Sequence, residues 1–475
     1  MHDVYIFNTM GRNIQLFKPL HEGSVGFYGC GPTVYNYAHI GNLRTYIFED
    51  TLVRMLKRFG YEVTHVMNIT DVGHLSSDDD TGEDKMLKSA RERGQSVLEI
   101  AQFYTDAFFR DTERLNIQQP KIICKATDHI QYMIELIKRI EANGYTYFAG
   151  GNLYFDVSKF DRYGELAGLQ LDQLKAGARV ELDPNKRNPF DFVLWFTKSK
   201  FDKQALLWES PWGIGYPGWH IECSAMSMKY LGEQFDIHAG GVDHIAVHHT
   251  NEIAQSEAAT GHKWVNYWMH AEFLVIDKGK MSKSSGSFLT LESLIDRGYD
   301  PLDYRYFCLG GHYRSQLSFS WEGLDQAKSA RLSLVDKVLA LKEKVAKPAA
   351  LSELGEKALQ YRSAFDEALA DDLAMPRAMA QVWNLLKDND VPAQDALALI
   401  LDMDEVLGLD LAKAQRKEVS VDPETLQWIN SQIERRAAAK KARDFATADA
   451  IRSELIAKGI QLEDRPEGTV WRLHE

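Results

Sequence analysis

The sequence has few cysteines, no long apolar run and no excess of positive charge, and each shortage excludes a class of protein. Its four cysteines are far apart in the chain, which excludes a disulfide framework and fits a reducing compartment. No apolar run is long enough to span a bilayer, and the N-terminus lacks the basic and apolar stretches of a signal peptide. We therefore expect a cytoplasmic protein that does not enter a membrane.

The net charge of −13 limits how this chain can bind nucleic acid. The surface as a whole, with this excess of negative charge, should repel the phosphates of nucleic acid. Any RNA contact must therefore come from a local basic patch. Hydrophobic residues make up 45% of the chain and charged residues 26%, which is ordinary for a globular protein with an ample core. From the usual size of domains, the chain should contain about three.

Residues 25–67 have the pattern of a β-α-β unit. Residues 25–30 read as a short buried strand, apolar residues then recur at helical spacing as far as Phe59, and residues 63–67 read as the next strand. Such a unit points the free N–H groups at the start of its helix toward the crevice beyond the strand ends, where a phosphate binds favourably. His39 can donate to phosphate oxygens, and Gly41 lets a flat ring approach the backbone. The alternative is that these two residues only cap the helix and fill a turn.

His248 and Glu252 are four residues apart in a helical stretch, so they lie one above the other on a single face. Such a pair is a two-ligand arm for a metal, although it is more often a surface contact. Zinc takes N, S and O donors in a tetrahedral array, and the distant Cys30 and Cys223, which abut the crevice, could complete the set. The competing donors in this stretch are His244 and His249. We expect the second of these to face a different side of the helix.

A cationic segment follows a strand expected over residues 272–277. It contains Lys280 and Lys283, which flank small hydroxyl residues before a glycine. Two lysines in such a mobile loop can close over a polyphosphate. The alternative is an ordinary basic turn.

The periodicity of the remaining chain predicts an α/β protein with a helical C-terminal part. Residues 191–196 should be a strand, residues 235–243 should give a strand that ends in a diglycine turn, and a helix should begin at Ser224. A further helix ends near Leu115, and its buried face should consist of Ile100, Phe103, Tyr104, Ala107 and Phe108. We expect a Rossmann-like parallel-sheet catalytic domain in 1–119 and 206–275, an inserted segment in 120–205, a connecting fold in 276–320, a helix bundle in 321–411 and a small α/β unit in 424–475.

The last unit should consist of one helix and a hairpin. The apolar side of that helix, expected to face inward, consists of Phe445, Ala448, Ile451 and Leu455. Its early part is basic, over residues 435–443. Basic residues beside aromatic ones suit unpaired RNA bases and their phosphates; the alternative is a solvated face.

Six short motifs together match one family, although each alone is weakly specific. They are Cys30-Gly31-Pro32-Thr33-Val34-Tyr35, His39-Ile40-Gly41-Asn42, Asn68-Ile69-Thr70-Asp71, Gly218-Trp219-His220-Ile221-Glu222-Cys223-Ser224-Ala225-Met226, His248-His249-Thr250-Asn251-Glu252 and Lys280-Met281-Ser282-Lys283-Ser284. With these motifs the chain resembles the cysteinyl-tRNA synthetases, a class I aminoacyl-tRNA synthetase family, essentially from end to end.

The resemblance implies a metal site and an amino-acid site. One zinc ion would be bound by Cys30, Cys223, His248 and Glu252, and it would take the thiolate of the substrate L-cysteine as an additional ligand. A serine hydroxyl cannot reproduce this Zn–S bond. The rest of the amino acid would be framed by Gly31, Thr70 and Trp219.

The resemblance also implies two ATP-dependent steps that need no covalent enzyme intermediate. ATP with Mg²⁺ would form cysteinyl-adenylate and pyrophosphate, and cysteine would then move to the 3′ end of its tRNA. His39, Lys280 and Lys283 would be catalytic, and the ATP contacts would also include Gly41, Asn42, Gly240, Gly241 and Asp243. The inserted segment would help to place the acceptor end, the C-terminal unit would read the anticodon, and the protein would be a monomer.

The chain departs from the family pattern at two positions. Asn42 stands where the signature usually ends in histidine, and Lys440 falls where arginine is common, which puts a bidentate base contact there in doubt. The nearest rival function is a paralogous ligase that joins cysteine to an amino sugar, for which residues 424–475 would have no use. A nucleotidyltransferase of the same superfamily would lack the zinc ligands, and a non-catalytic RNA-binding relative would not need His39 and the two lysines.

Overall fold

A computed structural model of the chain describes residues 3–72, 96–168, 183–198, 206–276, 289–415, 423–465 and 468–473. The chain divides into two compact units, Met1–Ala414 and Gln415–Glu475. Among the described residues, no helix is long and apolar enough to cross a membrane.

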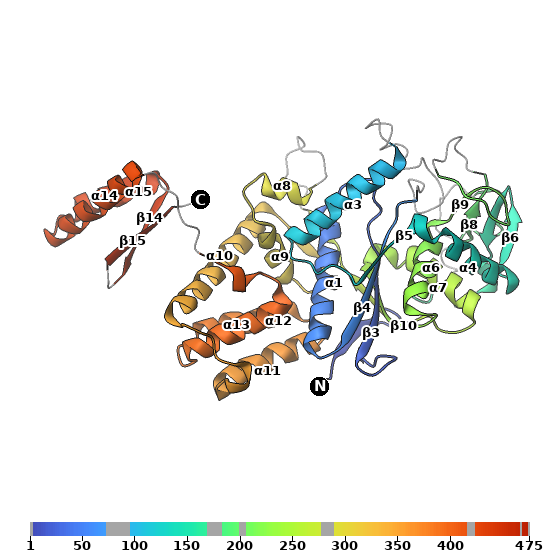
Figure 1. Cartoon of the computed structure of the whole chain (residues 1–475), viewed down its shortest axis with the longest axis horizontal. Helices are drawn as coiled ribbons and strands as arrows, with labels where there is room; N and C mark the ends of the chain where they lie inside the picture. The colour runs from blue at the N-terminus through green and yellow to red at the C-terminus, as the bar shows by residue number, and fades with distance from the viewer. Residues whose placement is uncertain are drawn as a thin grey trace. The chain divides into compact units, whose positions relative to one another are not determined.

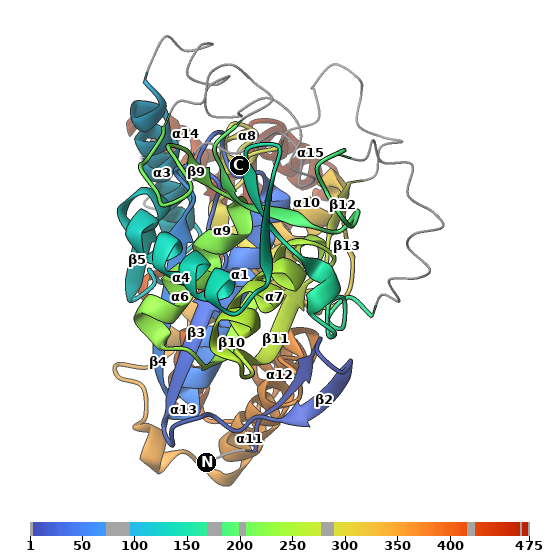
Figure 2. The ribbon, with the colours of Figure 1, turned by 90° about the vertical axis from the view of Figure 1, so that its right-hand side faces the viewer.

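The first unit is built around a five-stranded parallel sheet with the strand order β11-β10-β3-β4-β5. In Figure 2, β4, β3, β10 and β11 lie side by side. Their bounds are β3 Ser24–Gly29, β4 Glu62–Ile69, β5 Ile122–Lys125, β10 Phe235–Gly241 and β11 Val265–Ala271. The expected Rossmann-like fold class is confirmed, and β3 and β4 with the helix between them form the expected β-α-β unit.

Helices cover both faces of this sheet (Figure 1). Successive residues of a strand point to opposite faces, and Phe27 and Tyr28 of β3 accordingly belong to different cores. Phe27 packs with Phe48 and Leu52 of α1 (Ile40–Arg58). Tyr28 packs in the core formed by α4 (Ile130–Ala142), α6 (Trp219–Leu231) and α7 (His248–Thr260).

The chain order creates a switch point between β3 and β10. The connection from β3 to β4 runs through α1 on one face, whereas the connection from β10 to β11 runs through α7 on the other. Neighbouring loops therefore diverge beyond the carboxyl ends of β3 and β10, which is where open α/β sheets bind their ligands. Cys30 directly follows β3, and Gly241 ends β10.

The remaining elements of the first unit surround this sheet. A four-stranded antiparallel sheet has the order β6-β7-β8-β9, and two small pairs are β1-β2, antiparallel, and β12-β13, parallel. The strands are β1 Tyr5–Asn8, β2 Asn13–Leu16, β6 Thr146–Ala149, β7 Asn152–Phe155, β8 Phe192–Phe196, β9 Tyr216–Pro217, β12 Leu274–Ile276 and β13 Leu317–Phe319. The helices are α3 Val97–Arg114, α8 Leu291–Ile295, α9 Pro301–Leu309, α10 Trp321–Lys344, α11 Glu356–Ala370, α12 Met375–Lys387 and α13 Ala393–Leu407. The last four are the helices expected in residues 321–411.

The second unit contains α14 Pro423–Lys441, α15 Phe445–Ala457 and the antiparallel hairpin β14 Ile460–Arg465 and β15 Gly468–Leu473. Its buried core is small and consists of Ile429, Ile451, Leu455, Ile460 and Leu462. Two helices stand where one was expected, because the backbone leaves the helical region at Arg443, whose φ is 61°. Phe445, expected to face inward, is 63% exposed, and the basic Arg436 is buried.

Several expectations for the first unit are wrong in detail. Helix α6 begins at Trp219, five residues before Ser224, and strand β11 was not expected at all. Phe103 of α3 is exposed although it was assigned to the buried face. The boundaries of the expected subdivisions stay predictions, although β5, which lies inside 120–205, pairs with β4 in the central sheet.

Candidate active site

A cavity of about 320 Å³ lies at the carboxyl ends of β3 and β10. Most of the residues singled out in the sequence line it. They are Cys30, Gly31, His39, Asn42, Thr70, Trp219, Cys223, Gly240, Gly241, Asp243 and His248. Glu252 lies fully buried behind the cavity, and Gly41 lies next to the ring of His39. Lys280 and Lys283 fall outside the described residues.

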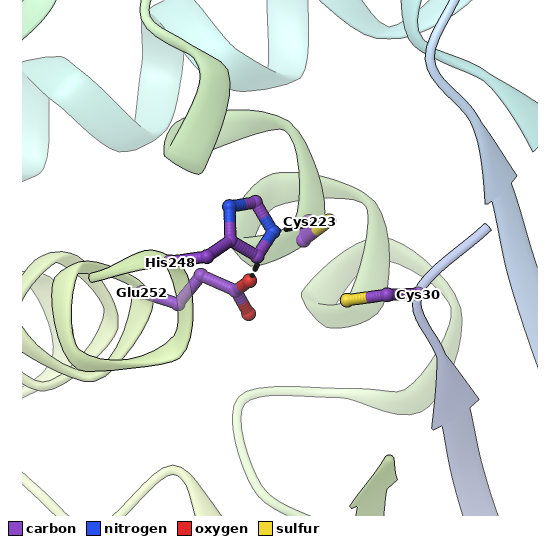
Figure 3. A group of neighbouring side chains, drawn as sticks. All are labelled: Cys30, Cys223, His248 and Glu252. Atoms are coloured by element: carbon purple, nitrogen blue, oxygen red, sulfur yellow. Dashed lines mark hydrogen bonds and ion pairs between the residues drawn. The ribbon is translucent and has the colours of Figure 1, made fainter. Parts of the chain in front are cut away.

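At the floor of the cavity lies a cluster of four donors: Cys30, Cys223 and His248, which line the cavity, and Glu252, which lies directly behind them. One ligand atom from each lies within 4.8 Å of the others, and all four residues are buried. Figure 3 shows them converging from the end of a strand and from two helices. His248 Nε2 lies 2.7 Å from Glu252 Oε1 and 3.6 Å from Cys223 Sγ. The four residues are those that the resemblance implied.

Two further histidines hold this cluster in place. His220 Nδ1 lies 2.9 Å from His248 Nδ1, which turns the Nε2 of His248 toward the other donors. His238 Nε2 lies 2.7 Å from Glu252 Oε2 and donates to that carboxylate. Sequence reasoning assigned neither contact. His220 precedes Cys223 by three residues, and this helical spacing could have indicated that His220 lies near the donors. No spacing in the sequence indicates that His238 on β10 reaches Glu252.

A second group of four donors overlaps the first. Cys30, His238, His249 and Glu252 also have ligand atoms within 4.8 Å of one another. His249 Nε2 lies 3.3 Å from Cys30 Sγ, and its Nδ1 lies 2.8 Å from His270 Nε2. His249 therefore stays a competing donor, because facing a different side of α7 does not keep this histidine away from Cys30.

The electrostatics of the floor favour a cation. Burial alone raises the pKa of Glu252, but His238 and His248 outweigh it and hold that pKa below its usual range. Burial alone lowers the pKa of His248, but Glu252 and Cys223 raise it above its usual range. The proton on His248 thus balances a buried carboxylate, and a metal ion could take the place of this proton.

The donor chemistry also fits a metal ion. Glu252 Oε1 is buried, and its partner within the described residues is His248 Nε2, 2.7 Å away. This carboxylate thus lies among two thiols and an imidazole, and its buried charge needs a proton or a metal ion to compensate for it. Thiolates, imidazole and carboxylate are the ligands that zinc takes in tetrahedral sites.

Beside the floor, a chain of hydrogen bonds fixes the predicted amino-acid site. Thr70 Oγ1 donates to Glu222 Oε2 over 2.9 Å, and Asn68 Nδ2 donates to Thr70 Oγ1 over 3.0 Å. Asn68 Oδ1 accepts from Gly31 N over 2.8 Å. A Cβ on Gly31 would lie 1.6 Å from the carbonyl oxygen of Asn68, so only glycine fits there. The ring centroid of Trp219 lies 4.5 Å from that of His248, which places this indole over a floor donor.

At the mouth of the cavity, His39 and Asn42 cap helix α1. His39 Nδ1 accepts from Asn42 N over 3.1 Å, and Asn42 Oδ1 accepts from His39 N over 3.2 Å. Since Nδ1 is an acceptor, the neutral ring carries its proton on Nε2. Burial lowers the pKa of His39, and Asp243 opposes that shift. A Cβ on Gly41 would lie 3.0 Å from the His39 ring, so this glycine leaves room for the imidazole.

Comparisons with known proteins point to one family. A family model described as the class I (C) tRNA synthetase catalytic domain matches residues 16–329. A cysteine–tRNA ligase of Treponema denticola is 58% identical over 489 aligned positions, which cover 98% of the chain and 99% of that relative. Cysteine–tRNA ligases of Treponema pallidum and Borrelia turicatae are each 46% identical over 98% of the chain, covering 99% and 98% of those relatives.

The fold has a known counterpart among solved structures. The methionyl-tRNA synthetase of Mycobacterium tuberculosis in complex with methionyl-adenylate has a TM-score of 0.58 at 17% identity, covering 82% of this chain and 93% of that one. At this identity the likeness concerns the fold alone, and it supports the class I architecture around the parallel sheet.

Proposed function

Because the chain belongs to the cysteine–tRNA ligases, a family of class I aminoacyl-tRNA synthetases, we propose that Cys30, Cys223, His248 and Glu252 bind one zinc ion. The chain activates L-cysteine with ATP and transfers it to the 3′ end of its tRNA, as its family membership implies. The full-length match to cysteine–tRNA ligases supports this function over the rival one, in which cysteine is joined to an amino sugar.

The convergence of these four donors carries the zinc proposal. They lie within 4.8 Å of one another, and three of them also line the cavity. His238 and His249, which belong to the alternative group, do not line the cavity. A metal held by the first group is therefore the one that a substrate thiol can reach, and His238 and His249 serve as hydrogen-bonding neighbours of its ligands.

The zinc would bind the thiolate of cysteine and thereby discriminate against serine. A site built on a bond that the competitor cannot form discriminates by about 10⁴- to 10⁵-fold without editing. The chain's own groups orient the remaining substrate. Thr70 and Gly31, held by Asn68, would position the amino acid beneath Trp219.

The mouth of the cavity would hold ATP with Mg²⁺ during attack of the cysteine carboxylate on the α-phosphate. His39 would donate from Nε2 and Asn42 from its side-chain amide, while Gly240, Gly241 and Asp243 would contact the nucleoside. Lys280 and Lys283, outside the described residues, would neutralise the phosphates. These groups act by positioning and by stabilising charge.

The tRNA would contact the chain at two further places. Residues 120–205 would help to place the acceptor end, and the second unit would read the anticodon. Exposed Phe445 and the exposed basic residues of α14, which are Arg435, Lys440 and Lys441, support that role because unpaired bases stack on aromatic rings. We further propose that the protein acts as a cytoplasmic monomer.

Replacing one thiol tests the metal assignment. Cys223→Ser should lose zinc and cysteine-dependent pyrophosphate exchange together, because a neutral hydroxyl replaces a thiolate ligand. Metal content by mass spectrometry and the exchange rate are the measurements. Cys308→Ser is the matched control, since Cys308 is also buried but lies outside both donor groups. Full zinc content in the Cys223 variant would show that the assignment is wrong.

A further inference from the structure

The cavity has two walls, and the proposed function uses only one of them. Gly240, Gly241 and Asp243 form the wall at the end of β10. The other wall comes from the loop after β3 and from α3, and it is aromatic. It consists of Tyr35, Tyr37, Tyr104 and Phe108.

Tyr37 is held rigidly in this wall. Its ring meets that of Tyr104 edge to face at 5.1 Å and 89°, and that of Phe103 at 6.0 Å and 70°. The loop that carries Tyr37 is tied to the end of β4, since Val34 N donates to the carbonyl of Thr70 and Thr70 N donates to the carbonyl of Pro32. A ring fixed in this way loses little conformational entropy when a ligand stacks on it.

Tyr37 also lies at the mouth of the cavity and not at its floor. The preceding Asn36 is exposed and Tyr37 is half-buried, whereas the four donors of the floor are all buried. The cavity volume of about 320 Å³ is small for a ligand site, since such sites hold ~300–1,000 Å³. The adenylate of the proposed reaction would therefore take up most of the interior, which leaves the rim for a second nucleoside.

The established reaction brings a second nucleoside to this rim. In the transfer step, a ribose hydroxyl oxygen of the terminal tRNA nucleoside bonds to the carbonyl carbon of cysteine. The bond from that carbon to the phosphate oxygen breaks, AMP leaves, and the hydroxyl proton leaves with it. The terminal base must therefore come to rest within one ribose of the reacting carbonyl.

We propose that the terminal base of the tRNA stacks on Tyr37 during this transfer. Stacking on an aromatic ring needs no positive charge, which suits a chain whose net charge is −13. It would also hold an unpaired nucleotide whose phosphates the surface as a whole repels. This inference rests on the proposed function, because it requires the adenylate to occupy the interior of the cavity.

Replacing the ring tests this inference in the full-length protein. Tyr37→Leu should lower the single-turnover rate of transfer from preformed adenylate by about ten- to a hundredfold, the usual loss when one stacked base loses its aromatic partner. The ratio of transfer to cysteine-dependent pyrophosphate exchange should fall by the same factor. Tyr37→Phe should transfer at nearly the parent rate, since it keeps the ring. Tyr5→Leu is the matched control, because Tyr5 is an exposed tyrosine of β1 that lies outside the cavity lining.

A tRNA with 2-aminopurine at its 3′ end gives a readout that a structural role would not change. Its fluorescence should be quenched on binding to the parent protein and to Tyr37→Phe, but not on binding to Tyr37→Leu. Equal losses of exchange and transfer, or a raised KM for ATP with normal transfer, would overturn the inference and assign this wall to ATP. Absence of cysteine-dependent exchange in the parent protein would instead contradict the proposed function itself.

Discussion

The floor and the mouth of the same cavity are built in opposite ways. At the floor, Cys30, Cys223, His248 and Glu252 are all at most 6% exposed, and histidines hold two of them by hydrogen bonds. At the mouth, Asn42 and Asp243 are exposed and His39 is only half-buried.

The difference fits what each end is proposed to bind. A floor that holds a resident metal gains from fixed, water-free donors, because the metal's charge compensates for their burial. A mouth that admits ATP and releases pyrophosphate in every cycle must exchange its ligands with water. Changes at the floor should therefore cost more activity than changes at the mouth.

The largest effect is expected at His238, which holds the floor carboxylate. His238→Phe keeps a ring against Trp268, with which the imidazole stacks at 4.7 Å, but it removes the donor to Glu252 Oε2. Zinc affinity should fall by about 10- to 100-fold, the usual cost of losing a hydrogen-bonded neighbour of a metal ligand. Competition against a chelator measures this change. His238→Gln, which keeps a donor, should recover most of the affinity, and unchanged affinity in the Phe variant would mean that Glu252 needs no such support.

A smaller effect is expected at Asn42, at the mouth. Asn42 Oδ1 already accepts from the backbone of His39, so only the side-chain NH₂ is available to donate to a phosphate. Asn42→Ala should slow adenylate formation by about tenfold, or ~1.4 kcal/mol, which is a typical neutral hydrogen bond. The loss should vary little between about pH 6 and 8, because the amide carries no charge.

Single-turnover adenylate formation measures this loss, and a thermal melt separates it from the loss of the helix cap. Asn42→His introduces the residue expected from the family signature, and this variant should form adenylate at about the parent rate. If Asn42→Ala loses more activity than His238→Phe, then the expectation that changes at the floor cost more than changes at the mouth is wrong.

The smallest effect concerns Asp111 of α3, a buried carboxyl without the histidine partners of Glu252. Burial raises its pKa to about 6, although Arg110 and Arg114 oppose the shift. The folded state thus holds this proton more tightly than the unfolded state, so stability falls as the pH rises from about 4 to about 6. Asp111→Asn should remove that dependence and raise the melting temperature at pH 7 by about 2 °C. Near pH 4 the substitution should not raise the melting temperature. An equal rise at pH 4 and pH 7 would contradict the raised pKa of Asp111.

Much of this site could be predicted from local sequence. The spacing of His248 and Glu252 fixes them on one face of α7, and the glycines and polar residues after β3 mark a ligand loop regardless of the rest of the fold. The capping pair of His39 and Asn42 is likewise local, because a helix start needs partners for its free N–H groups. The sequence pattern also predicted β3, β4 and β10, since buried parallel strands read as short apolar runs.

Other features could not be predicted because they depend on packing between distant segments. His238 reaches Glu252 only because β10 lies beside the start of α7, and the spacing of these residues does not reveal this contact. Strand β11 has the sequence Val265-Asn-Tyr-Trp-Met-His-Ala271, whose polar residues interrupt the apolar pattern of a buried strand. Phe103 and Phe445 match helical apolar stripes, yet both are exposed, because periodicity indicates a face and not whether another element covers it.

The sequence by itself determined which donors this protein has, which of them share a helix face, and where the helix start and the ligand loop lie. Only the tertiary structure decided that Cys30, Cys223 and the α7 pair converge on one point, because four donors from a strand end and two helices meet only after α6 and α7 pack together on one face of the sheet. The tertiary structure also decided the charge of this cluster of donors. Burial would by itself neutralise Glu252, and the histidines that keep this carboxylate ionised come from β10 and α7, brought together by the fold.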